Sequence, residues 1–240
     1  MNWKFLIGKT ISQIDQAIIR SNFDIVYKHY PFGRHWIFDL KRTLKFEVKL
    51  IVDAGANIGS VSKDLNHWFP SADIFAFEPV RSTFNILVNH TLKINKIHPE
   101  QLALGESNEK IELSLNPENT INSIKVKDLN HSLGTEEIQV IRLDEFIKQK
   151  KLSTVDILKV DVEGFEFEVL QGCGKLDINC ILLEVGYERE PTKVHFSDVE
   201  NYMEKLGYQL CGIYEIMRNL NNKEKIAYSN NLYIKKHLIQ

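Results

Sequence analysis

Apolar runs and helix-like segments alternate along most of the chain. Runs of strand length, each followed by polar or turn-forming residues, occupy 50–52, 74–77, 101–104, 155–160 and 180–185. Segments predicted to be helical occupy 58–68, 81–94, 143–149 and 198–206. Strands that alternate with helices predict an α/β fold, in which a mostly parallel sheet is covered on both faces.

Several extended segments depart from this alternation. Residues 110–115 have the alternating pattern of a more exposed strand, and residues 139–142 are expected to be extended. The polar segment 116–135 between them is predicted to be a mobile loop near the acceptor side of the binding site, of a length that is often functional. The last two predicted strands, 208–216 and 229–236, have no helix between them. They therefore predict an antiparallel hairpin at the end of the sheet.

The first 48 residues follow a different pattern. Apolar residues recur at steps of four and three over 3–20, which predicts a helix that docks one apolar face on the domain. A turn is expected at 30–33, followed by a short helix over 35–44. We therefore divide the chain into an N-terminal helical extension, residues 1–48, and a main domain, residues 49–240.

Composition and charge narrow the class of protein. Lys and Arg total 30, Asp and Glu total 32, and the net charge is -2, so an extended nucleic-acid-binding face is not expected. No apolar run approaches the length of a membrane span. The three cysteines are odd in number and far apart, which favours reduced thiols in a cytoplasmic protein over disulfides or a zinc site. These values are compatible with a homo-oligomer.

The first candidate binding motif is Asp53-Ala54-Gly55-Ala56-Asn57-Ile58-Gly59, where a predicted strand turns into a helix. Gly55 would let the backbone approach a ligand, and Gly59 would allow close packing at the start of the helix. Asn57 tolerates the left-handed conformation. The segment lacks the GxGxxG pattern that a pyrophosphate requires, and Asp53 suits a positively charged ligand.

Carboxylates also follow the next predicted strands. Glu78 ends the run 74–77 and could accept both hydroxyls of a ribose, or be an exposed side chain before a proline. Asp161 and Glu163 follow the run 155–160, where the alternatives are a helix cap for Asp161 and a favourable contact with the helix terminus for Glu163. Glu184 ends the neighbouring run and could instead anchor the loop that follows.

The order of these pieces resembles the FkbM-type methyltransferases over roughly residues 50–210. The segments that carry the resemblance are Val52 to Gly59, Phe75-Ala76-Phe77-Glu78-Pro79, Ala103-Leu104-Gly105, Leu143-Asp144-Glu145-Phe146, Leu158 to Glu166 and Val169-Leu170-Gln171-Gly172. The resemblance implies a Rossmann-like class I methyltransferase fold with a seven-stranded sheet and the cofactor S-adenosylmethionine. The N-terminal extension lies outside the matching segments, and we expect it to cap the active site. Phe165 departs from the family, which usually has a small residue there.

The resemblance also implies roles for individual residues. Residues 53–59 would wrap the methionine part of the cofactor, Glu78 would bind the ribose, and Ala103 and Leu104 would lie near the adenine. Asp161 should lie beside the transferable methyl group. The residues expected to bind the cofactor are Asp53, Gly55, Asn57, Gly59, Glu78, Pro79, Ala103, Leu104 and Asp161.

Family members often methylate hydroxyls on sugars, lipids or secondary metabolites, and such a hydroxyl must lose its proton. Asp161 is the first candidate for the base, and Glu184 and Glu163 are further catalytic candidates. These carboxylates could also hold a divalent metal, but no histidine-rich pattern supports one and we expect none. Two other classes stay open: an NAD-dependent oxidoreductase, and a cofactor-binding fold without catalysis.

Overall fold

The computed structural model describes residues 28–115, 134–190, 192–219 and 224–239. The chain divides into two compact units, Met1–Lys45 and Phe46–Gln240. In the first unit, helix α3 (Trp36–Thr43) follows a turn at 30–34 and lies within the predicted range. The helix predicted over 3–20 and loop residues 116–133 lie outside the described residues, so the capping role of the extension stays a prediction.

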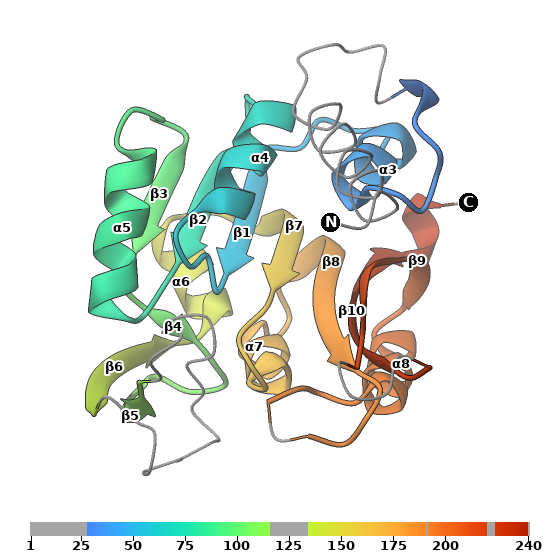
Figure 1. Ribbon diagram of the computed structural model, residues 1–240. Coiled ribbons are helices and arrows are strands. Elements are labelled where there is room, and N and C mark those ends of the chain that lie inside the picture. The colour runs from blue at the N-terminus through green and yellow to red at the C-terminus, as the bar shows by residue number, and fades with distance from the viewer. Residues whose placement is uncertain (1–27, 116–133, 191, 220–223, 240) are drawn as a thin grey trace, which may run out of the picture. The chain divides into compact units, whose positions relative to one another are not determined.

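The second unit is built on a seven-stranded sheet in the order β3-β2-β1-β7-β8-β10-β9 (Figure 1). Neighbouring strands from β3 to β8 are parallel, whereas β10 is antiparallel to both β8 and β9. The predicted sheet and its terminal hairpin are therefore confirmed. The strands are β1 (Leu50–Ala54), β2 (Asp73–Phe77), β3 (Ile97–Glu100), β7 (Thr154–Val160), β8 (Asp177–Gly186), β9 (Tyr208–Arg218) and β10 (Ile226–Lys235).

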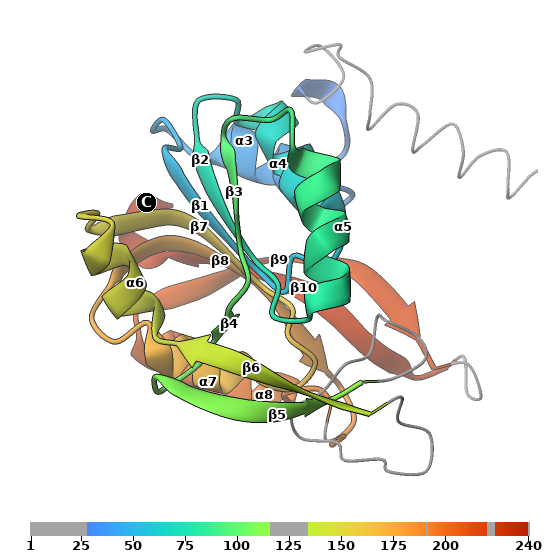
Figure 2. The same ribbon diagram turned by 90° about the vertical axis from the view of Figure 1, so that its left-hand side faces the viewer.

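Helices cover both faces of this sheet. Figure 2 shows α4 and α5 on one side of the strands and α6 on the other. Helices α6, α7 and α8 contribute Leu143, Val169 and Val199 to one buried cluster with Val52 and Leu158 of the strands. Apolar strands buried on both faces explain the continuous apolar runs in the sequence. The helices are α4 (Ser60–Trp68), α5 (Arg81–Thr91), α6 (Leu143–Gln149), α7 (Glu166–Gly172) and α8 (Phe196–Lys205), with a short 3₁₀ helix at Lys236–Leu238.

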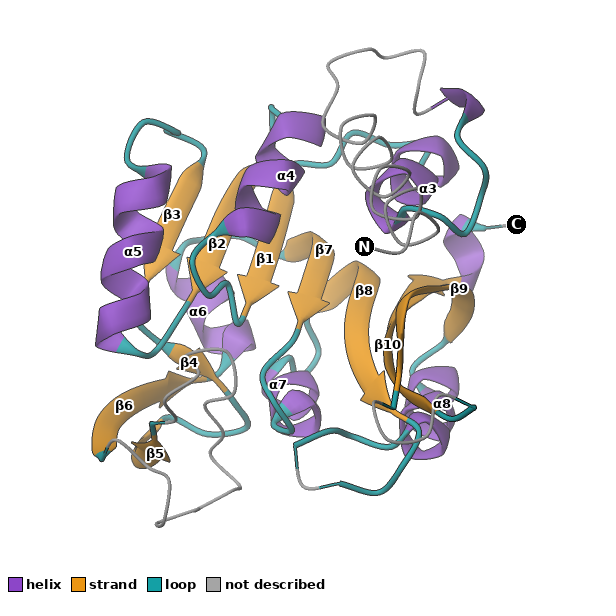
Figure 3. Cartoon of the chain, in the orientation of Figure 1, coloured by secondary structure: helices purple, strands orange, loops and turns teal. Residues whose placement is uncertain are grey.

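A small second sheet was not predicted. It contains β4 (Ala103–Leu104), β5 (Glu109–Ser114) and β6 (Thr135–Ile141) in the order β4-β6-β5 (Figure 3). The interpretation of 101–104 as the third strand of the main sheet was wrong, because that place is taken by β3. The sequence of β3, Ile97-His98-Pro99-Glu100, lacks the apolar run by which a buried strand is recognised. The strand lies at the sheet edge, where polar residues and a proline are tolerated.

The small sheet contacts helix α7 through two glycines. A Cβ atom added to Gly172, the last residue of α7, would lie 1.9 Å from the carbonyl oxygen of Gly105, which follows β4. Two backbone segments that are distant in the sequence therefore touch where no larger residue fits.

The central strands position the site. Strands β1 and β7 are parallel neighbours, with Ala54 beside Val160. From β1 the chain continues to β2 and β3 on one side, whereas β7 leads to β8 on the other. The loops after β1 and β7 therefore flank the point where the strand order reverses, which is where open α/β sheets bind ligands.

Candidate active site

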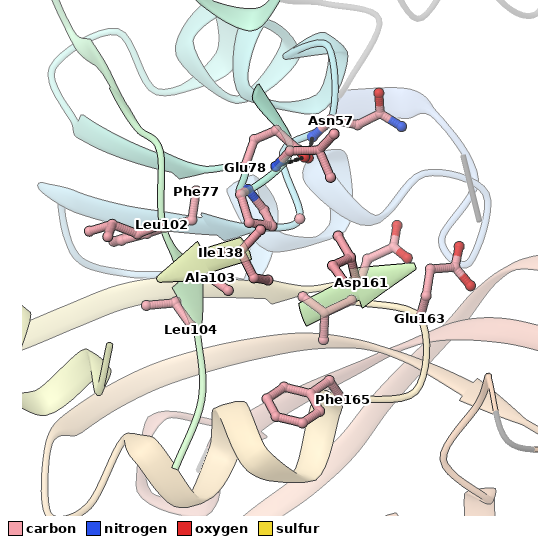
Figure 4. A pocket seen from close by; sticks show the side chains of 15 residues that line it. Asn57, Phe77, Glu78, Leu102, Ala103, Leu104, Ile138, Asp161, Glu163 and Phe165 are labelled. Carbon is pink, nitrogen blue, oxygen red and sulfur yellow. Dashed lines mark hydrogen bonds between the residues drawn. The ribbon is translucent and has the colours of Figure 1, made fainter. Parts of the chain in front are cut away.

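A cavity opens at the carboxyl ends of β1, β2 and β7 (Figure 4). Together with its open mouth, which is filled by solvent, it spans about 760 Å³. Of the predicted site residues, Asp53, Gly59 and Glu184 do not line it. Those that do are Gly55, Asn57, Glu78, Pro79, Ala103, Leu104, Asp161 and Glu163.

The loop after β1 has the backbone that its sequence predicted. Gly55 has a φ of +76°, and a Cβ there would lie 1.9 Å from the backbone oxygen of Asp161. Asn57 is left-handed, with a φ of +48°. Gly59 also has a positive φ, and a Cβ there would lie 2.6 Å from the Leu87 side chain. Gly55 and Asn57 therefore shape the cavity, whereas Gly59 permits close packing between α4 and α5.

Glu78 is held at the end of β2 by two backbone amides. The Asn57 amide donates to its Oε2 at 3.1 Å, and the Val80 amide donates to its Oε1 at 3.0 Å. The residue is only 7% exposed, and this burial raises the pKa of Glu78 to about 7 although both amide bonds favour the charged form. Each oxygen keeps a further lone pair, so the carboxylate can still accept hydrogen bonds from a ligand.

Asp53 lies behind the cavity and is fully buried. The Ser62 hydroxyl donates to its Oδ2 at 2.6 Å, and the Lys159 Nζ lies 3.3 Å from its Oδ1. The carboxylate is thus engaged by two groups of the protein. The structure therefore gives Asp53 a position from which it supports the loop after β1 rather than facing a ligand.

Lys159, on β7, joins the two central loops and was assigned no role from the sequence. Its Nζ donates to the Gly55 carbonyl oxygen at 3.1 Å and lies 3.3 Å from carboxylate oxygens of both Asp53 and Asp161. Burial disfavours the ammonium, but the charges of Asp161 and Asp53 outweigh it and raise the pKa of Lys159 above its usual value. A charged residue inside the apolar run 155–160 was a readable signal, because Lys is almost never fully buried unless it is paired.

Asp161 is not a helix cap. Helix α7 begins at Glu166, and the amides of Gly164 and Val162 donate to the Glu166 side chain. Asp161 instead projects from the end of β7, with a side chain 36% exposed and paired with Lys159. This geometry removes the structural alternative that its sequence position left open.

Glu163 and Glu184 lie beside Asp161. One carboxylate oxygen from each of the three residues lies within 4.8 Å of the others. The Lys193 Nζ donates to Glu163 at 2.6 Å and also to Glu184. Burial, with the Asp161 charge, raises the pKa of Glu184 to about 7, and burial also raises the pKa of Glu163. As predicted, Glu184 stands on the strand next to β7.

The cavity combines an apolar wall with an acidic one. Val80, Leu113, Ile138 and Phe165 contribute to the apolar side, so the unpredicted small sheet supplies part of the wall. The charged side chains among the described lining residues are all carboxylates, those of Glu78, Asp161 and Glu163. Such a cavity favours a ligand that has a flat apolar part and a positive charge.

Comparison with protein families identifies the chain. The sequence profile of the methyltransferase FkbM domain matches residues 53–210, which include the end of β1, all of β2 and β7, and the loops around the cavity. The chain belongs to the FkbM methyltransferase family. The resemblance inferred from the sequence motifs is therefore confirmed.

Individual relatives of this FkbM-family chain are distant. Methyltransferase 1 of Beauveria bassiana is 33% identical over 142 residues, which are 51% of this chain and 57% of the relative. The 2-O-methyltransferase NoeI of Sinorhizobium fredii is 24% identical over 139 residues, 51% of this chain and 56% of the relative. The chain thus covers somewhat more than half the length of these relatives.

A solved structure supports the fold. The crystal structure of methyltransferase FkbM from Methylobacillus flagellatus superposes with a TM-score of 0.51 at 17% identity, covering 97% of this chain and 60% of that one. At this identity the likeness concerns the Rossmann-like fold alone. No helix in the described part of the FkbM-family chain has the length and apolar character that crossing a membrane requires.

Proposed function

We propose that this chain is an S-adenosylmethionine-dependent methyltransferase that acts on a hydroxyl group. The observation that carries the proposal is the charge of the cavity lining: Glu78, Asp161 and Glu163 surround a space whose opposite wall is apolar. S-adenosylmethionine has a flat apolar adenine and two positive charges, so it fits both walls. The pyrophosphate of NAD would face carboxylates here, which argues against an oxidoreductase.

The lining suggests how the cofactor would be held. Glu78 would accept hydrogen bonds from the ribose hydroxyls. Ala103 and Leu104 would enclose the adenine from one side, and Pro79 would enclose it from the other. Gly55 and Asn57 would approach the methionine part through their backbone. Asp53 and Gly59 would act indirectly, through Lys159 and through helix packing.

The acceptor side would be formed by Asp161, Glu163 and Glu184. The bound cofactor supplies a methyl group on a positively charged sulfur. Asp161 would hold or deprotonate the acceptor hydroxyl, and alignment of that oxygen supplies much of the rate acceleration. A relative that is named a 2-O-methyltransferase supports a hydroxyl acceptor, as on a sugar, a lipid or a secondary metabolite.

Calorimetry with S-adenosylmethionine, S-adenosylhomocysteine and NAD tests the proposal. We expect both sulfur compounds to bind with Kd values on the order of micromolar, and NAD not to bind. Binding of NAD alone would favour the oxidoreductase. Binding of the cofactor without methyl transfer to any hydroxyl in a broad acceptor screen would favour a module without catalysis.

Replacing Glu78 by Ala is expected to weaken S-adenosylhomocysteine binding by roughly 1–3 kcal/mol, because buried hydrogen-bonding groups lose their partner. Calorimetry measures the change, and Glu109→Ala, an exposed carboxylate on β5, serves as the control without effect. Unchanged affinity in the Glu78 variant would disprove the ribose contact.

The affinity for S-adenosylhomocysteine is also expected to rise about tenfold from pH 6 to pH 8. Since the pKa of Glu78 is raised to about 7, its carboxyl is mostly protonated at pH 6 and mostly ionised at pH 8. Only the ionised form offers both oxygens as acceptors. Glu78→Gln does not titrate and should give a flat profile, so an equal slope in both proteins would assign the effect to another group.

A further inference from the structure

Lys193, in the segment between β8 and α8, contacts Glu163, which lines the acidic end of the cavity. The backbone around it is fixed, because the Gly186 amide donates to the Val194 carbonyl at 2.7 Å and the Lys193 amide donates to Glu190 at 3.3 Å. Its side chain is only 12% exposed. The sequence offers no pattern that marks this lysine.

The ammonium of Lys193 contacts two carboxylates at once. It donates to Oε2 of Glu163 and to Oε2 of Glu184. An ammonium has three hydrogens. The Tyr228 ring also lies near Nζ, with its centroid 5.3 Å away, which is a cation–π distance and not that of a hydrogen bond.

Without Lys193, the same residues would form a typical ligand set for a hard divalent cation. Oxygens of Asp161, Glu163 and Glu184 lie within 4.8 Å of one another, and magnesium, manganese and calcium prefer such carboxylate oxygens. Asp161 is already paired with Lys159, so each of the three carboxylates has a lysine beside it.

We propose that Lys193 is a built-in cation of the acceptor site, which takes the place of a divalent metal and donates its third N–H to the acceptor oxygen. The inference rests on the proposed methyl transfer, because it assigns the residue that orients the acceptor. A metal would fix that oxygen by coordination. Lys193 does so by a charge-assisted hydrogen bond, while Glu163 and Glu184 hold the ammonium in place.

A metal-binding experiment tests this without a known acceptor. Mn²⁺ is titrated into the full chain, and free Mn²⁺ is followed by electron paramagnetic resonance. The wild type should bind Mn²⁺ only weakly at this site. Lys193→Met should bind it roughly tenfold to a hundredfold more tightly, because the positive charge in contact with two of the three carboxylates has been removed. Lys225→Met, which removes a surface lysine paired with Glu188, should behave as the wild type.

A double variant connects the new binding to these carboxylates. Lys193→Met combined with Glu184→Gln should lose the gained Mn²⁺ affinity, since one ligand has gone. Tight Mn²⁺ binding to the wild type, or no gain in Lys193→Met that remains folded by circular dichroism, would overturn the proposal. S-adenosylhomocysteine binding to the wild type reports separately on the proposed function, so the two can fail independently.

Once an acceptor is found, kinetics add a second readout. Lys193→Met should raise KM for the acceptor at least about tenfold, as expected for the loss of a charge-assisted hydrogen bond, with little change in cofactor affinity. Lys193→Arg keeps the charge and should recover part of the loss. A variant that lowers cofactor affinity and acceptor affinity equally would instead indicate a general structural role.

Discussion

Asp161→Asn is expected to lower the rate of methyl transfer by about 10²–10⁴, the range for loss of a general base. The fold should be preserved, because the side chain is 36% exposed and Lys159 keeps its contacts with Asp53 and the Gly55 carbonyl. Cofactor affinity should change little for the same reason. An amide has nearly the shape of a carboxylate, so the substitution removes the charge and the basicity.

The measurement requires an acceptor, which a screen of sugar, lipid and phenolic hydroxyls should provide. Single-turnover rates of Asp161→Asn and wild type are then compared at saturating cofactor. Asp198→Asn, a surface carboxylate paired with Arg189, is a suitable control. Turnover near the wild-type rate in Asp161→Asn would move the base to Glu184 or Glu163.

Lys159→Met should lower the free energy of unfolding by about 3–5 kcal/mol, the usual cost of breaking a buried ion pair from one side. Methionine fills a similar volume but leaves the fully buried Asp53 without its counter-charge. The raised pKa of Lys159 means that its contribution is complete at every pH below its unfolded value of about 10.4 and is lost only as pH rises through the higher folded value. Urea denaturation at pH 7.5 therefore measures the whole effect.

The matched control for this prediction is Lys96→Met. Lys96 pairs with Asp73 at 3.0 Å, but both side chains are more than 40% exposed, so the loss should be at most about 1 kcal/mol. If Lys159→Met costs no more than this control, the buried pair does not stabilise the central loops. S-adenosylhomocysteine affinity should fall only in the Lys159 variant, because only there does the Gly55 loop lose a support.

Local chemistry explains which parts of the site could be predicted. The turn from β1 into α4 depends on backbone conformations that Gly55, Asn57 and Gly59 adopt at low cost, so the residue types reveal the geometry. Glu78 and Asp161 could be placed because parallel strands bring their carboxyl ends to one edge. These inferences need only strand ends and turn residues, which are short-range properties.

The missed features depend on contacts that are distant in the sequence. Lys193 meets Glu163 across 30 residues, and its own segment has no periodicity. Asp53 was expected to face a ligand, because nothing in its neighbouring sequence indicated that Lys159, on another strand, would form an ion pair with its carboxylate. The small sheet escaped detection because β4 has only two residues and pairs with β6, more than 30 residues later.

The contact between Gly105 and Gly172 separates parts of the protein that can be redesigned from parts that cannot. A side chain at Gly172 would collide with the backbone of Gly105, and one at Gly105 would crowd the side chains of Val140 and Phe165, so we expect both positions to require glycine. Beyond that contact, β5 and β6 form a hairpin-like unit whose Leu113 and Ile138 reach the cavity. Libraries that vary those two side chains, with both glycines retained, should alter ligand preference while the centre around Lys159 stays intact.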